Sequence, residues 1–175
     1  MPRFFQPNEV KAKSGVDPDV LRDRRRRGLL EGIGVIQLPN GGWTKDPEEA
    51  RKLGIERVSW VYTVGDLLAL VVAERLTAGL GIDLVKALDL ATQINTVVYD
   101  WAIQAAGADK HRYVLAWPST EGENPSGVTV DRLSVIRLND LNRSENYMAE
   151  KAILLDLKRL ADRLPEPLLT LIRND

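Results

Sequence analysis

The chain has 175 residues, of which 44% are hydrophobic and 28% are charged, and its formal net charge is −1. This composition is typical of a folded globular protein and excludes a disordered chain. It contains no cysteine and a single histidine, which excludes disulfides and thiolate metal sites and argues against a histidine-based zinc site. We therefore expect no metal and no cofactor.

The charge is distributed unevenly along the chain. Residues 1–30 contain eight Lys or Arg and four acids, whereas the remaining residues contain 16 bases and 21 acids. The two parts therefore carry +4 and −5. A basic head on an acidic body favours contact with a polyanion through one face of the molecule.

The sequence predicts a protein that does not enter a membrane. The first residues lack the apolar run of a signal peptide. The most apolar stretch, residues 64–80, is interrupted by Asp66, Glu74 and Arg75 and is poorly suited to crossing a bilayer. We expect a cytoplasmic location.

Two short helices are predicted near the start of the chain. Pro7 suits the first turn of a helix over residues 7–14, and Gly15 suits its end. Asp17 is placed to cap a second helix that begins with Pro18 and runs to about Arg27. Two helices joined by a glycine-centred turn are typical of a helix-turn-helix.

The next part of the sequence predicts a small hairpin with an inserted helix. Residues 34–38 favour a strand, residues 39–42 a turn and residues 43–45 the returning strand. Residues 46–54 favour a capped short helix, and residues 56–62 favour a further strand.

Two long helices are predicted next. Thr63 is placed to cap the first, from residue 64 to about Gly79, and Asp83 to cap the second, from residue 84 to about Ala106.

The last third of the sequence predicts a small α/β module. Strands are expected over residues 112–117, where Pro118 would end the strand, within residues 128–138, and over residues 152–157. The segments 119–127 and 139–147 read as loops, residues 158–163 as a helix, and Pro165 and Pro167 as its stop or restart. The predicted fold class is α+β, with an N-terminal winged helix-turn-helix over residues 1–82, a connecting or dimerisation helix over 83–108, and an α/β module over 109–175.

The cationic second helix is the predicted site of DNA contact. Helical spacing places Arg22, Arg25 and Arg26 on one broad face, flanked by Arg24 and Arg27. Arginine binds phosphate, or the O6 and N7 atoms of guanine, through two parallel hydrogen bonds. Base contact is expected from Arg22, with Arg25 and Asp23 as further candidates, and phosphate contact or support from Arg26 and Arg27. The candidate DNA-binding residues are Lys11, Lys13, Arg22, Asp23, Arg24, Arg25, Arg26, Arg27, Asn40, Thr44 and Lys45.

The order of several segments resembles the MerR family of bacterial transcription regulators. The segments are residues 15–22 (Gly-Val-Asp-Pro-Asp-Val-Leu-Arg), 26–30 (Arg-Arg-Gly-Leu-Leu), 62–67 and 79–88, and the resemblance covers roughly residues 5–95. It implies a winged helix, DNA binding, and a DNA-contacting role for Arg22.

The sequence also departs from that family. Asp23 and Arg24 replace a common Tyr-Tyr pair, and Trp60 stands where the wing usually carries Arg. The wing is longer by residues 46–54, and an α/β module replaces the usual long dimerisation helix.

For two further groups of residues, the sequence is compatible with two interpretations each. Asn40 with Thr44 and Lys45 forms either a wing tip on DNA or an ordinary hairpin. Trp101, Tyr113 and Trp117 line either an effector pocket or the hydrophobic core. His111 with Asp109 and Lys110 reads as a loop, and the acids Asp131, Asp140 and Glu145 show no catalytic spacing, so no enzyme is expected.

The predicted function is that of a sequence-specific transcription regulator that acts on double-stranded DNA as a homodimer on a palindromic site. The long helices at 64–106 or the C-terminal strands would form the dimer. One alternative is a DNA-architectural, recombination or phage accessory protein with the same winged helix. Another is an antitoxin or adaptor that binds a protein partner through its C-terminal module, with residues 118–150 as the cue.

Overall fold

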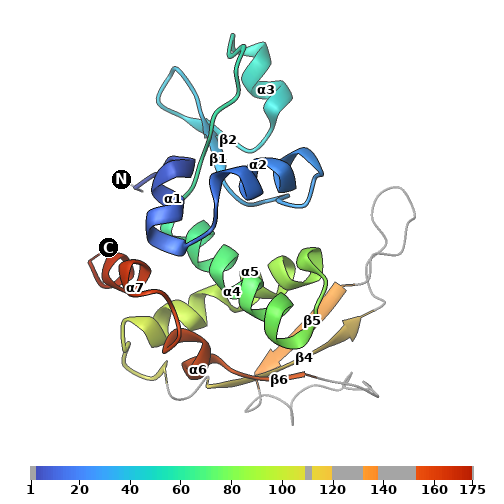
Figure 1. The fold of residues 1–175 in the computed structure, drawn as a ribbon, viewed down its shortest axis with the longest axis vertical. Helices are drawn as coiled ribbons and strands as arrows, with labels where there is room; N and C mark the ends of the chain where they lie inside the picture. Colours follow the sequence, from blue (N-terminus) through green and yellow to red (C-terminus); the bar gives the residue numbers. More distant parts are fainter. Residues whose placement is uncertain (1–2, 109–111, 120–131, 138–152, 175) are drawn as a thin grey trace.

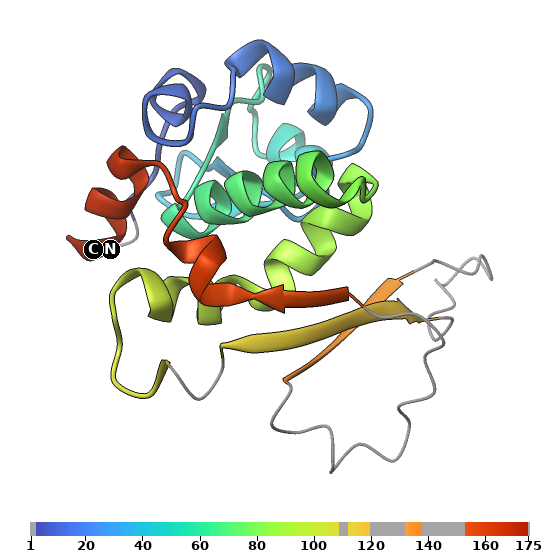
Figure 2. The same cartoon turned by 60° about the horizontal axis from the view of Figure 1, so that its bottom comes forward.

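The computed structural model describes residues 3–108, 112–119, 132–137 and 153–174. These residues form a mixed α and β fold in which helices surround a central buried helix and two small antiparallel sheets lie at opposite ends (Figures 1 and 2). The predicted α+β class is confirmed. In the described part of the chain, no helix has the length and apolar character needed to span a membrane.

The two predicted N-terminal helices are confirmed. Helix α1 spans Pro7–Ser14 and ends at Gly15, whose φ of +81° is a left-handed conformation that glycine adopts without strain. Helix α2 spans Pro18–Arg26 and is capped by Asp17, whose carboxylate accepts a hydrogen bond from the Asp19 backbone N–H at 2.9 Å. The short turn between the caps sets α2 across α1.

The first sheet has the strand order β2-β1-β3, with β1 at Val35–Gln37, β2 at Trp43–Thr44 and β3 at Trp60–Val61. The hairpin between β1 and β2 was predicted and is confirmed. The third strand is shorter than predicted, because β1 is only three residues long and offers partners to Trp60 and Val61 alone.

The N-terminal segment joins this sheet at one point. Phe5 and Tyr62 form an isolated antiparallel bridge, in which the two backbone N–H groups donate to the opposite carbonyls at 2.8 and 2.9 Å.

The predicted inserted helix is α3, Pro47–Lys52, capped by Asp46. It covers the hairpin through a small apolar cluster that contains Ile36, Leu38 and Ala50. Together the hairpin and α3 project from the rest of the molecule at the top of Figure 1.

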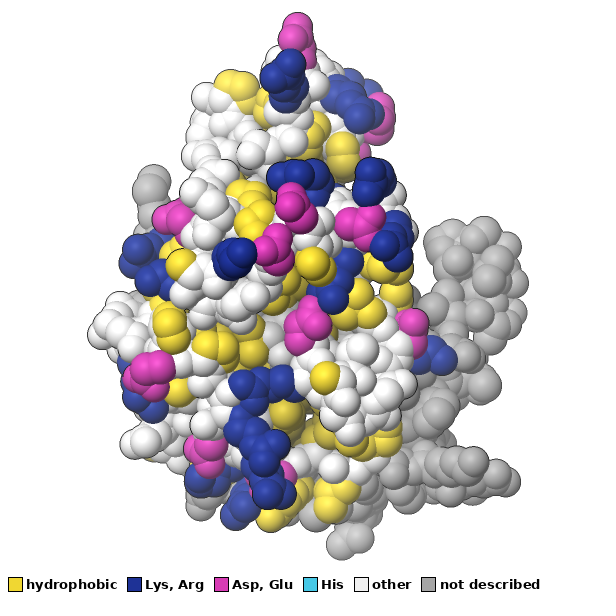
Figure 3. Space-filling model, in the orientation of Figure 1, with side chains coloured by type: hydrophobic (Ala, Val, Ile, Leu, Met, Phe, Trp, Pro, Cys, Tyr) yellow, Lys and Arg dark blue, Asp and Glu magenta, His cyan; other side chains and the backbone are white. Residues whose placement is uncertain are grey.

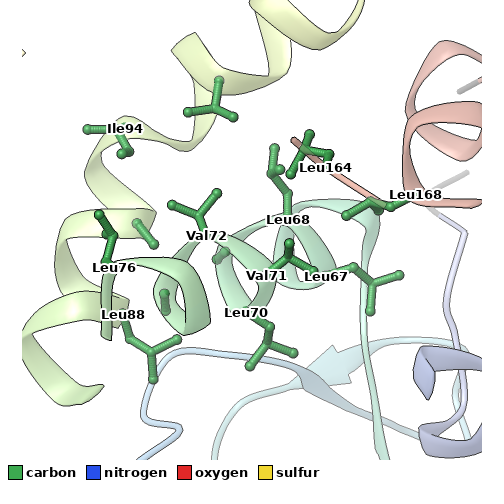
Figure 4. Packing of buried hydrophobic residues seen from close by; sticks show 14 of the residues in the cluster. Leu67, Leu68, Leu70, Val71, Val72, Leu76, Leu88, Ile94, Leu164 and Leu168 are labelled. Atoms are coloured by element: carbon green, nitrogen blue, oxygen red, sulfur yellow. The ribbon is translucent and has the colours of Figure 1, made fainter. Parts of the chain in front are cut away.

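Helix α4, Val64–Leu80, lies at the centre of the fold. Thr63 and Asp66 cap it reciprocally, as the sequence predicts for Thr63. Its apolar side chains point in several directions into neighbouring elements (Figure 4), and nine of its residues are buried. A helix that is apolar on most sides is stable only when it is surrounded by protein.

Helix α5, Leu84–Ala102, packs along α4 after a cap by Asp83. It ends four residues earlier than predicted. The backbone leaves helical geometry at Gln104, whose φ is +56°.

The second sheet has the order β5-β4-β6, with β4 at Tyr113–Ser119, β5 at Arg132–Arg137 and β6 at Ile153–Asp156. The prediction that Pro118 ends the first of these strands is wrong, because β4 continues to Ser119. Strand β6 pairs only with the first part of β4, so Pro118 has a neighbouring strand on one side and needs no N–H for the other. Of the predicted loops at 119–127 and 139–147, Ser119 belongs to β4 instead, and the other residues lie outside the described part of the chain.

The chain returns to its start through α6, Leu157–Ala161, and α7, Glu166–Arg173. Helix α7 packs against α1, α4 and α5, so the two ends of the described chain lie side by side in both ribbon views (Figures 1 and 2). One continuous apolar core runs from Phe5 to Ile172 and crosses both predicted domain boundaries. The three-part division of the chain remains a prediction.

Candidate nucleic-acid interface

Helix α2 is anchored to the body of the protein by its inner side. Leu21 is buried in the main core, to which Val10 and Val16 also belong, and α1 and α2 are in contact. The five arginines of residues 22–27 therefore cannot all face solvent, and the structure divides them.

Arg24 points toward the body of the protein. Its guanidinium pairs with the carboxylate of Glu74 on α4, and its side chain is only 19% exposed. The expectation that Arg24 flanks the outer face of α2 is corrected: this arginine ties α2 to α4.

Arg25 also points inward, toward the first sheet. Its guanidinium donates to the backbone carbonyls of Leu30, at 2.6 Å, and Ile33. It also stacks over the Trp60 ring, 3.7 Å from the ring centroid. The expected outer face of Arg22, Arg25 and Arg26 is therefore corrected, because Arg25 joins α2 to the loop after it and to β3.

Gly34 makes this inward position of Arg25 possible. Its φ is +77°, and a Cβ atom there would lie 3.1 Å from the Arg25 guanidinium and 3.1 Å from the Val61 carbonyl oxygen. Only glycine combines this backbone conformation with such a close approach.

The outer face of α2 carries Arg22, Arg26 and Arg27, whose side chains are 78%, 79% and 65% exposed. Arg22 pairs with Asp19 at 2.9 Å, and Arg26 and Arg27 both pair with Asp23. Hydrogen bonds from Arg26, and then Arg27, hold the pKa of Asp23 below its ordinary value. The predicted contact residue Asp23 thus orients two of the three exposed guanidiniums.

This outer face is a mixed surface of both signs. Figure 3 shows basic and acidic side chains interleaved over the area that α2 occupies. Ion pairs between exposed side chains are weak and are screened by salt. A phosphate can therefore replace Asp19 or Asp23 as a partner of these arginines at little cost in stability.

The two lysines of α1 differ in their contacts. The Lys11 ammonium donates to Asp17 at 2.7 Å, and this hydrogen bond raises the pKa of Lys11 and lowers that of Asp17. Lys13 is half-buried in the last turn of the same helix.

The three hairpin residues predicted to contact DNA differ in their exposure to solvent. Asn40 is exposed at the turn, where its side-chain oxygen accepts from the Gly42 N–H at 2.9 Å, and Lys45 is exposed and donates to the Gly32 carbonyl at 2.6 Å. Thr44 is corrected as a contact residue: it is 7% exposed, and its hydroxyl donates to Glu49 of the insert.

Trp43 is a surface residue that the sequence interpretation did not single out. Strand alternation turns Thr44 inward and leaves Trp43 exposed on the opposite face of β2. The alternation of inward and outward side chains along a strand is the sequence signal that could have identified Trp43 as exposed.

Of the three aromatic residues considered for an effector pocket, the two whose side chains are described, Trp101 and Tyr113, are not found in the same pocket. Trp101 lines a pocket of about 400 Å³ with residues of α6 and α7. Tyr113 is absent from that lining and lies beneath the Arg112 guanidinium. The side chain of Trp117 lies outside the described residues, as do Asp109, Lys110, His111, Asp131, Asp140 and Glu145.

No protein-family model matches the chain, and no curated protein is significantly similar to it. Within the ranges that the structure describes, no group of three or more His, Cys, Asp or Glu side chains could hold a metal ion. A function for this chain is therefore inferred from the geometry of α2 and the hairpin.

Proposed function

We propose that the chain is a sequence-specific, double-stranded DNA-binding transcription regulator with a MerR-like winged helix-turn-helix. In this proposal α1 and α2 form the helix-turn-helix, and the β1–β2 hairpin with α3 forms the wing. The observation that carries it is the division of the α2 arginines. Leu21, Arg24 and Arg25 hold the helix rigidly, while Arg22, Arg26 and Arg27 are free to exchange exposed partners.

The exposed arginines have different proposed roles. Arg22 lies in the first half of α2, the part of a recognition helix that reaches base edges, and we assign it to base contact. Arg26 and Arg27 follow one turn later and are assigned to phosphate. Lys45 and Asn40 on the hairpin are the proposed wing contacts.

We assign the dimer contact to the C-terminal sheet. Helix α4 is mostly buried within one chain and is exposed only toward its C-terminal end. Strand β6 has β4 as its partner among the described strands, so its other edge is the proposed place for a second copy to pair. A second copy would double the DNA-binding surface of the protein, and the two-fold symmetry of the dimer would match that of a palindromic site. The proposal implies a cytoplasmic protein associated with the bacterial nucleoid.

The test is selection of genomic fragments by the purified full chain, followed by fluorescence anisotropy on the selected duplex. Arg22→Ala should weaken binding to the selected duplex by about 1–3 kcal/mol. It should also reduce the preference of the protein for that sequence over others. Arg26→Ala should weaken all duplexes equally and reduce the slope of log affinity against log salt by about 1.

Lys158→Ala is the matched control, because Lys158 is a basic residue of α6, across α4 from α2 (Figures 1 and 2). It should leave DNA affinity unchanged. The assignment fails if the Arg22 and Arg26 variants bind as tightly as the unmodified protein. One palindrome near a promoter supports a regulator, whereas phased repeats support the architectural alternative.

A further inference from the structure

A surface pocket lies between the C-terminal end of α4 and the junction of β6 with α6. Its volume is about 530 Å³, within the range of small-molecule sites. Arg75, Arg159 and Arg163 line it from α4, from α6 and from the segment that follows α6. Figure 3 shows Lys and Arg side chains gathered in the lower part of the molecule, where α6 lies in Figure 1.

The three guanidiniums lack a direct ion-pair partner within the described part of the chain, and only Arg159 lies near enough to Asp156 to help lower the pKa of that carboxyl. None of them forms an ion pair there, whereas the arginines of the outer face of α2 all do. Arg75 is half-buried, and its burial, together with repulsion from Arg163, lowers its pKa. The acid on the pocket wall, Asp156, is held by Arg112 at 2.8 Å. An anion in the pocket would relieve this unbalanced positive charge.

Apolar side chains complete the lining. Leu80 and Leu154 belong to the few exposed large hydrophobic residues, and both line this pocket. Leu76 and Leu155 also line the pocket and are buried. A ligand that covers the leucines and reaches the guanidiniums must combine an apolar part with an anionic group.

We propose that this pocket binds a small anionic molecule with an apolar portion, of the aryl or alkyl phosphate or carboxylate class. Arg75 and Arg163 hold the anionic group, and Leu80 and Leu154 cover the apolar portion. The recognising chemistry is shared by phosphates and carboxylates, so the test compares both.

The pocket is connected to α2 through one residue. Glu74 precedes Arg75 on α4 and pairs with Arg24 of α2. A ligand that moves Arg75 therefore acts on the turn of α4 that holds α2. This coupling rests on the proposed DNA-binding function, whereas occupation of the pocket does not.

The test is calorimetric titration of the full chain, without DNA, with 1-naphthyl phosphate, 1-naphthoate, inorganic phosphate and 1-naphthol. One of the two apolar anions should bind at a single site at least about tenfold more tightly than inorganic phosphate and 1-naphthol. The double variant Arg75→Gln/Arg163→Gln should lose about tenfold or more of that affinity. Arg51→Gln, which removes an exposed arginine of α3, should change nothing.

Leu154→Glu provides a second variant, in which both pocket arginines are kept. Leu154 is 57% exposed, so a carboxylate is accommodated there and competes with the ligand for the guanidiniums. Affinity should fall while the urea midpoint stays the same. The pocket proposal is overturned if neither anion binds saturably, or if both variants bind as the unmodified protein does.

A separate measurement tests the coupling. Saturating 1-naphthyl phosphate, or 1-naphthoate if that binds more tightly, should change DNA affinity at least about fivefold. Glu74→Gln should abolish this change while ligand binding persists. Ligand binding with unchanged DNA affinity overturns the coupling alone, and absence of any DNA binding overturns the proposed function and leaves the pocket result intact.

Discussion

Neighbouring arginines of α2 have different environments, and their positions on the helix decide what each does. Arg22 is exposed and pairs with Asp19 on the same helix. Arg25, three residues later, is fixed by two backbone carbonyls and the Trp60 ring. Removing Arg25 leaves carbonyl oxygens without a donor in a partly buried place, whereas removing Arg22 leaves only solvated groups.

This contrast gives a prediction at the residue scale. Arg25→Ala should lower the free energy of unfolding by about 2 kcal/mol, because hydrogen bonds from a charged donor and the cation–π contact are lost together. Urea unfolding followed by circular dichroism measures it. Arg22→Ala is the control and should stay within about 0.5 kcal/mol of the unmodified protein. Equal stability of the two variants would contradict the structural role of Arg25.

At the scale of elements, one carboxylate joins the second sheet to α6. Asp156 is the last residue of β6 and the cap of α6, where it accepts from the Arg159 backbone N–H at 3.1 Å. It also accepts from the Arg112 guanidinium, next to the start of β4. The hydrogen bond from Arg112, opposed in part by desolvation, holds the pKa of Asp156 below its ordinary value of 3.8.

The pH dependence of stability follows from this lowered pKa. The folded protein keeps Asp156 ionised more readily than the unfolded chain does, so its contribution is full above about pH 4 and is lost as the pH falls through the lower folded pKa. Asp156→Asn keeps a capping oxygen but cannot ionise. The difference in unfolding free energy between the two proteins should be constant at pH 5–7 and shrink below pH 4, as measured by urea unfolding at each pH. A difference that grows on acidification would refute the prediction.

At the scale of the whole molecule, the last helix closes the fold onto its beginning. Helix α7 packs against α1, and Leu168 on it is fully buried in the core that also contains Val10 and Leu21. The proposed DNA-binding helices are therefore stabilised by residues at the far end of the sequence. One continuous core favours one cooperative unfolding transition.

Leu168→Ala tests this closure. The cavity it creates should cost about 3 kcal/mol of unfolding free energy. Hydrogen exchange in a urea series should show α2 and β4 losing protection together, and to the same extent, in this variant. Thr170→Ala, at an exposed position of α7, is the control and should have little effect. Loss of protection in α2 while β4 keeps its own would instead support separate domains.

The sequence alone determined where most helices and strands of this protein begin, because the residues that signal these positions lie next to them in the chain. Caps at Asp17, Thr63 and Asp83 and the left-handed Gly15 act within one helical turn, so three helix starts and the end of α1 could be predicted. The ends were less certain, as at Gln104 and Pro118, because strand pairing and backbone geometry beyond the local window decide them.

Tertiary structure decided how the candidate interface is built. Helical spacing groups the α2 arginines by angle, but Glu74 and Trp60, about 35 to 50 residues further along the chain, decide that Arg24 and Arg25 turn inward. The same holds for the return of α7 to α1 and for the meeting of Arg75 with Arg163, since neither contact leaves a local pattern in the sequence. The sequence placed the cations on one short helix, and long-range packing selected Arg22, Arg26 and Arg27 as those that remain exposed.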